Sequence, residues 1–121
     1  MTEQDPWLTV LSSKLIRVRY TGSGGDRVLH EHWCPGCRMM HQIAVEQPFR
    51  NGARWTWDGN AAAPTFSPSI HIRLGRSNGG ADRVCHYFIR GGRIEFCGDS
   101  THALSGQAVD LPDIPPEERL A

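Results

Sequence analysis

Residues 86–97 read HYFIRGGRIEFC, and this stretch decides the fold class. Two segments of alternating apolar and polar residues flank a pair of glycines, which predicts a β-hairpin with a two-residue loop. The short loop fixes the register, so that Arg90 pairs with Arg93 and His86 faces Cys97. An antiparallel sheet built from such hairpins is therefore expected.

Similar alternation, broken by glycine-rich and Asn-Gly turns, predicts strands along the rest of the chain. The predicted strands are residues 14–20, 28–33, 41–46, 53–57, 69–74, 83–89, 93–97 and 107–111. One short helical turn is expected at residues 101–105, with Asp99 or Ser100 as its N-cap. The fold class is thus mostly β, a small antiparallel sheet or sandwich.

Length and composition indicate a single domain over residues 1–121 that stays in the cytoplasm. The chain has 121 residues, 13 basic against 13 acidic side chains, and no apolar run of membrane-spanning length. Its N-terminus lacks the basic start and apolar core of a secretion signal. Residues 1–10 and 112–121 are expected to be extended or frayed.

Four cysteines in a reducing compartment favour metal ligation over disulfides. Cys34-Pro35-Gly36-Cys37 is a C-x2-C knuckle, which brings two sulfur atoms toward one ion and is typical of half a zinc site. A thioredoxin-like redox pair would need a βαβ unit, which the strand pattern does not predict, and two buried thiols are the remaining alternative.

The second half of the site has two possible closures. Side chains alternate along a strand, so Cys85 and His86 point to opposite faces and only one of them can reach the ion. One closure adds Cys85 and a histidine such as His102 to the knuckle, whereas the other adds His86 and Cys97. Further candidates near the cysteines are His32 and His41, while His30 and His71 are expected to be hydrogen-bonded or at the surface.

Several strings in the chain resemble a family of small phage and prophage zinc-binding proteins of unknown function, often mislabelled ammonia monooxygenase. The strings are HWCPGC at 32–37, GARWTWDGN at 52–60, PTFSPS at 64–69, CHYF at 85–88 and DSTHALSGQ at 99–107. The resemblance implies a zinc-binding β fold with Cys34, Cys37 and Cys85 as ligands and with His86 and His102 competing for the fourth place. It makes Cys97 a less favoured ligand, because relatives usually carry an aliphatic residue there, and it places more distant relatives near bacterial ubiquitin-like conjugation genes.

The expected function is that of a zinc-stabilised phage or prophage module that binds a protein or another macromolecule of the host or phage, with counter-defence as one role. A structural zinc is favoured because small β domains often need a metal to fold. The sequence assigns no catalytic residue, since it lacks the H-E-x-x-H and zinc-deaminase patterns. The alternatives are a small zinc hydrolase, with His86, His102 or Asp99 assisting a zinc-bound water, and a nucleic-acid-binding module.

Two further groups of residues have competing interpretations. Trp55, Trp57 and Phe66 suit the core of a small sheet better than a recognition groove. The hydroxyl-rich segment Ser67-Pro68-Ser69 and four arginines, Arg54, Arg73, Arg90 and Arg93, are candidates for binding a phosphate or an acidic partner. The competing interpretation is that these arginines form a solvated strand face, which is their usual role.

Overall fold

The computed structural model describes residues 7–22, 25–76 and 82–119, and its elements are almost all strands. In chain order they are β1 (Leu8–Ser12), β2 (Leu15–Tyr20), β3 (Arg27–Cys34), β4 (Met39–Ile43), β5 (Thr56–Trp57), β6 (Phe66–Arg76), β7 (Asp82–Arg90), β8 (Arg93–Phe96), β9 (Ala108–Asp110) and α1 (Pro116–Arg119). The prediction of a mostly β fold is confirmed.

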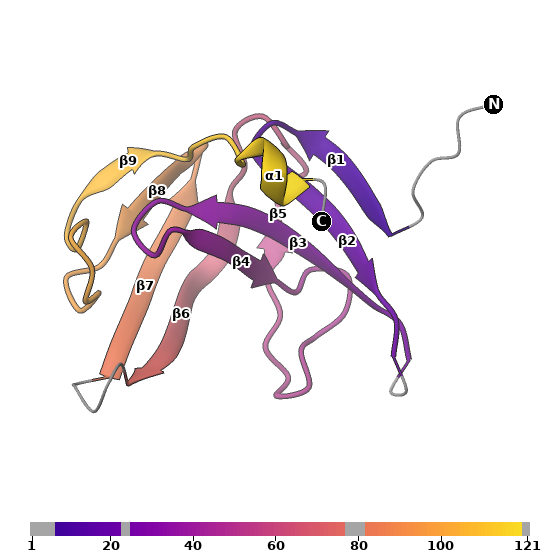
Figure 1. The fold of residues 1–121 in the computed structure, drawn as a ribbon, viewed down its shortest axis with the longest axis horizontal. Helices are drawn as coiled ribbons and strands as arrows, with labels where there is room; N and C mark the ends of the chain where they lie inside the picture. The colour runs from indigo at the N-terminus through magenta and orange to yellow at the C-terminus, as the bar shows by residue number, and fades with distance from the viewer. Residues whose placement is uncertain (1–6, 23–24, 77–81, 120–121) are drawn as a thin grey trace.

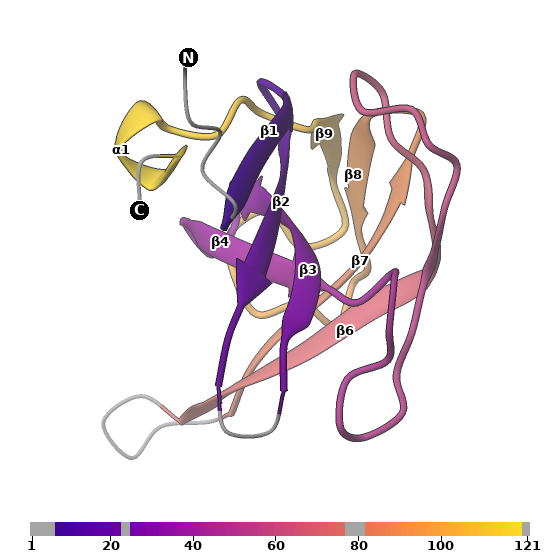
Figure 2. The ribbon, with the colours of Figure 1, turned by 90° about the vertical axis from the view of Figure 1, so that its right-hand side faces the viewer.

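The strands form two antiparallel sheets that pack as a sandwich. One sheet has the order β1-β2-β3-β4 and the other has the order β5-β6-β7-β8-β9. Figures 1 and 2 show β1 to β4 on one side of the molecule and β6 to β9 on the other. Buried residues of both sheets meet in one core, which includes Leu15, Cys34, Ile43, Phe66, Ile70, Cys85, Tyr87, Ile89, Ile94, Phe96 and Leu111.

The predicted hairpin forms β7 and β8, in the predicted register. Arg90 pairs with Arg93 and Ile89 pairs with Ile94. Along β7, Cys85, Tyr87 and Ile89 are buried, whereas the residues between them are partly exposed. This alternation directs one face of β7 into the sandwich and the other face outward.

The aromatic residues of the central region contribute to the core, as the sequence suggested. Phe66 is buried, while Trp55 and Trp57 are partly buried and pack against the core. The Trp57 and Phe66 rings stack with their centroids 6.2 Å apart. Trp55 also lines a surface groove.

The expected position of the helical turn needs correction, and a regular element reaches into each end segment of the chain. The helix lies at Pro116–Arg119, where proline at the first turn and two following glutamates suit a helix start. Residues 103–106 form a turn instead, preceded by a bend at His102. β1 begins at Leu8, inside the segment expected to be extended or frayed, and it pairs with β2 across a turn that has no glycine or proline to signal it. Residues 1–6 and 120–121 lie outside the described residues.

Candidate metal centre and an adjacent Ser-His-Asp cluster

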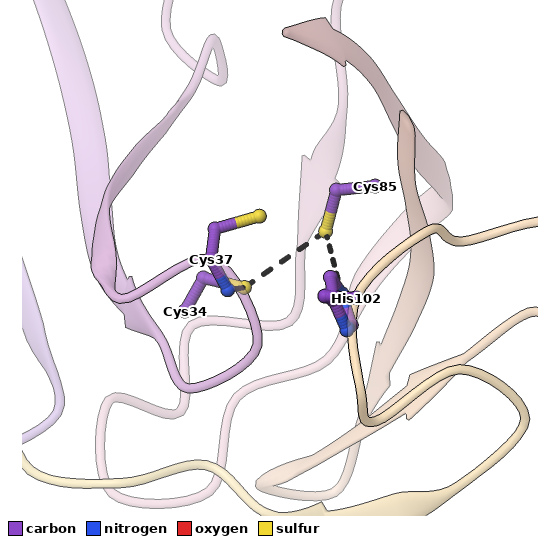
Figure 3. Close-up of side chains that lie close together, drawn as sticks. All are labelled: Cys34, Cys37, Cys85 and His102. Carbon is purple, nitrogen blue, oxygen red and sulfur yellow. Dashed lines mark hydrogen bonds between the residues drawn. The ribbon is translucent and has the colours of Figure 1, made fainter. Parts of the chain in front are cut away.

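Four side chains from three parts of the chain meet between the two sheets. The metal cluster consists of Cys34, Cys37, Cys85 and His102, whose ligand atoms all lie within 4.8 Å of one another. Cys34 ends β3, Cys37 lies in the following turn, Cys85 is in β7, and His102 is in the loop after β8. Figure 3 shows the four side chains pointing toward one another.

Short contacts define the geometry of the cluster. Cys34 Sγ lies 3.8 Å from Cys85 Sγ, and Cys85 Sγ lies 3.4 Å from His102 Nε2. Within the knuckle, the Cys37 amide donates to Cys34 Sγ at 3.3 Å, and the Arg38 amide donates to the Cys34 carbonyl at 2.8 Å. Arg38 has a φ of 57°, so the turn closes in the left-handed region.

The three thiols of the metal cluster shift one another's pKa values. Contacts with the Cys37 and Cys85 thiols lower the pKa of Cys34, whereas contact with Cys34 raises the pKa of both Cys37 and Cys85. The Cys34 thiolate is therefore stabilised, and its negative charge opposes the deprotonation of Cys37 and Cys85. A divalent cation removes this repulsion, and three sulfurs with one imidazole nitrogen are a donor set that suits zinc.

Gly36 makes room for the histidine of the metal cluster. A Cβ atom at this position would overlap the His102 ring, so only glycine fits between Pro35 and Cys37. We expect Gly36→Ala to lower the affinity of the metal cluster for added Zn²⁺ about 10- to 100-fold by displacing His102. Competition with a chromophoric chelator measures this affinity. The control is Gly22→Ala, because a Cβ atom there meets nothing within 4 Å. Equal zinc affinity in the two variants would contradict the role of Gly36.

The remaining metal candidates lie elsewhere. His86 points away from the metal cluster on the outer face of β7, and Cys97 is half-buried after β8. His32 and His41 are buried, and their ring nitrogens lie 2.7 Å and 2.9 Å from the Tyr87 hydroxyl.

Of the two predicted sets of ligands, the structure brings together the one that contains Cys85 and His102. His30 is buried beside Trp57, and His71 is exposed.

A second cluster consists of Ser69, His86 and Asp99. It lies on the outer face of the β6-β7 pair, whereas Cys85 of the metal cluster lies on the inner face. Ser69 Oγ is 3.2 Å from His86 Nε2, and both oxygens of the Asp99 carboxylate are 3.1 Å from His86 Nδ1. The imidazole thus lies between a hydroxyl and a carboxylate, one at each ring nitrogen. This is the hydrogen-bonding order of a Ser-His-Asp catalytic triad, which is recognised by geometry and not by chain order.

One loop supplies a residue to each cluster. Ser100 Oγ accepts from the His86 amide at 3.0 Å and donates to the His86 carbonyl at 2.9 Å. The Thr101 amide donates to the Val84 carbonyl at 2.9 Å. These bonds hold the loop along β7, with Asp99 against His86 on one side and His102 against Cys85 on the other.

Sequence reasoning did not group Ser69 with His86 and Asp99, which the structure brings together. Ser69 lies where the pairing of β6 with β7 is interrupted between Phe66 and Ile70. Such irregularities change the direction in which side chains point, and they leave no clear signal in the sequence. The alternation along β7 did predict that His86 and Cys85 face opposite ways, which separates His86 from the metal cluster.

A groove with a volume of about 500 Å³ opens beside Ser69. It is lined mainly by apolar side chains, which include Met40, Phe49, Trp55, Ile70, Ile72 and Leu74. β5 pairs with only the first two residues of β6. In the part of the chain that the structure describes, no strand covers that edge of β6 beyond Ser67.

Comparison with known proteins identifies one family. A family model described as "Bacterial ubiquitination-like system serine protease (BubE)" matches residues 9–97. No curated protein and no solved structure matches the chain. The matched stretch contains Ser69, His86 and the three cysteines of the metal cluster, and Asp99 and His102 follow shortly after it. The description agrees with the expected link to ubiquitin-like conjugation, whereas nothing in the match supports a phage origin.

In residues 7–22, 25–76 and 82–119, no helix has the length and apolar character needed to cross a membrane.

Proposed function

We propose that this chain, which belongs to the BubE family of bacterial ubiquitination-like system serine proteases, is a serine protease. Ser69 is the proposed nucleophile, His86 is the general base, and Asp99 is the acidic residue that orients the His86 ring. The hydrogen-bonded chain from Ser69 through His86 to Asp99 is the single observation that carries this proposal. It replaces the purely binding role that the sequence favoured.

In the proposed reaction, Ser69 Oγ attacks the carbonyl carbon of a peptide bond while His86 Nε2 takes its proton. Asp99 accepts a hydrogen bond from His86 Nδ1, which selects the tautomer with a free lone pair on Nε2 and stabilises the imidazolium. His86 then gives the proton to the leaving amine, so that the C–N bond breaks and an acyl-Ser69 ester remains. Water, deprotonated by the same histidine, hydrolyses the ester.

We assign a structural role to the metal cluster and propose zinc as its ion. Cys34, Cys37, Cys85 and His102 would fill all four positions of a tetrahedral zinc, which leaves none for a catalytic water. Bound there, the ion would supply cohesion between the two sheets and no chemistry. The expected alternative of a zinc hydrolase is therefore not favoured.

The metal cluster also positions the triad, in this proposal. Cys85 and His86 are consecutive in β7, while Asp99 and His102 lie in one loop. An ion that joins Cys85 to His102 fixes the strand and the loop relative to each other. The distance between His86 and Asp99 then depends on the ion, although the ion touches neither residue.

The substrate that fits the site is an extended polypeptide of the bacterial ubiquitination-like system. At Ser69 the edge of β6 is bonded by the Trp55 indole, which donates to the Ser69 carbonyl at 3.1 Å. Beyond Ser69, where no described strand pairs with this edge, a segment can add as a strand, and the apolar groove can hold one of its larger side chains. This agrees with the protein partner expected from the sequence. All four cysteines are free, which is consistent with the proposed cytoplasmic location.

The proposal is tested by replacing Asp99 with asparagine. Asparagine keeps the size of the side chain but can donate to His86 Nδ1, which favours the wrong tautomer, so kcat should fall about 10⁴-fold. Hydrolysis of fluorescently labelled, unfolded casein measures the effect. Asp110→Asn is the matched control, because Asp110 pairs with Arg93 on the same sheet and lies outside both clusters. If Asp99→Asn hydrolysed casein at the native rate, the assignment of the triad would be wrong.

A further inference from the structure

His71 lies beside the proposed triad, and the triad chemistry does not require it. In the β6-β7 pair, His71 is the direct cross-strand partner of His86. The two rings meet edge to face with their centroids 5.0 Å apart. Residues directly opposite on one face of an antiparallel pair point the same way, so both imidazoles share the outer face of the sheet.

Asp99 completes a second set of metal ligands on this face. One ligand atom each from His71, His86 and Asp99 lie within 4.8 Å of one another. Two imidazoles and one carboxylate are a donor set that binds divalent transition metals and leaves coordination positions open for water. The side chains are accessible to an ion from solvent, since those of His86 and Asp99 are 27% and 55% exposed.

We propose that His71, His86 and Asp99 form a second, inhibitory site for Zn²⁺. The existence of this site is independent of the protease assignment, whereas its inhibitory effect rests on the proposed function. An ion held by His86 and Asp99 occupies a lone pair of the imidazole. It also neutralises the carboxylate charge that orients the imidazole ring. Ser69 then has no base, so the bound ion and the competent triad exclude each other.

The second site is weaker than the metal cluster and fills after it. It offers three ligands in place of four, has no thiolate, and is more exposed. Thiolate-rich sites hold zinc more tightly, so the first equivalent of zinc goes to the cysteines. The protein would thus be active with one zinc ion per chain and inhibited with two.

Zinc titration of protein that already carries one ion per chain tests the site without reference to activity. With a chromophoric zinc indicator as competitor, the native protein should bind one further equivalent. His71→Gln should bind this equivalent about tenfold more weakly or not at all. Arg73→Gln, at the next outward position of β6, should bind it as the native protein does. Ser69→Ala should also bind it, because the hydroxyl is not a ligand.

The inhibitory effect is measured by casein hydrolysis with and without excess zinc. The native rate should fall at the concentration at which the second equivalent binds, whereas the rate of His71→Gln should not respond. Binding of only one ion by the native protein, or equal second-site affinity in native and His71→Gln, would overturn the site. Binding without inhibition would overturn its regulatory effect. Absence of casein hydrolysis by the native protein would contradict the protease assignment. The zinc titration would still show whether the second site exists.

Discussion

Replacing Ser69 with alanine should lower the rate of casein hydrolysis by about 10⁴- to 10⁶-fold while the protein stays folded and keeps its metal. The loss is this large because no other group takes over the covalent step once the hydroxyl is gone. The fold should tolerate the change, since Ser69 is only partly buried and the metal cluster lies on the opposite face of β7. Steady-state hydrolysis, together with zinc content and a thermal melt, checks all three expectations.

Ser67→Ala is the matched control for this prediction. Ser67 lies two residues earlier on the same strand and is exposed, and among the described residues it forms no hydrogen bond with His86. Its variant should hydrolyse casein at close to the native rate. The proposal fails if Ser67→Ala loses as much activity as Ser69→Ala, or if Ser69→Ala retains the native rate.

Removal of the metal should unfold the protein and abolish hydrolysis. Zinc binding to a structural site contributes about 10 kcal/mol or more to folding, which is comparable with the whole stability of about 5–15 kcal/mol of a typical domain. Dialysis against a strong chelator, or Cys85→Ser, should therefore eliminate the cooperative thermal transition. Circular dichroism and zinc analysis measure both effects, and added zinc should restore the dialysed protein.

Cys97→Ser is the control for the loss of a thiol. Cys97 is half-buried and does not belong to the metal cluster, although one predicted closure of the site used it. This variant should bind one zinc ion tightly and melt within a few degrees of the native protein. A chelated protein that melted and hydrolysed casein like the native protein would contradict the structural role of the metal.

The sequence was sufficient for those features that depend on local rules. The glycine pair fixed the β7-β8 hairpin and its register, and the C-x2-C spacing identified the knuckle. Strand alternation predicted that Cys85 and His86 could not serve the same ion. It therefore placed the two side chains on the faces where the structure has them.

The features that the sequence did not predict depend on an irregular strand register and on the path of a loop. The contact between Ser69 and His86 requires the β6-β7 register, which shifts twice along the pair. The choice of His102 over Cys97 depends on the path of a loop, and that path is set by hydrogen bonds of Ser100 and Thr101 to β7. Neither feature has a local sequence signal.

Labelling with a fluorophosphonate probe tests the central claim most directly. An activated serine oxygen displaces fluoride from the probe to form a stable phosphonate ester, and serines without a base react far more slowly. The account predicts a single adduct in the folded, metal-loaded protein, located by mass spectrometry on Ser69 and lost in His86→Ala. An adduct on another serine, or equal labelling of Ser69 in His86→Ala, would contradict it.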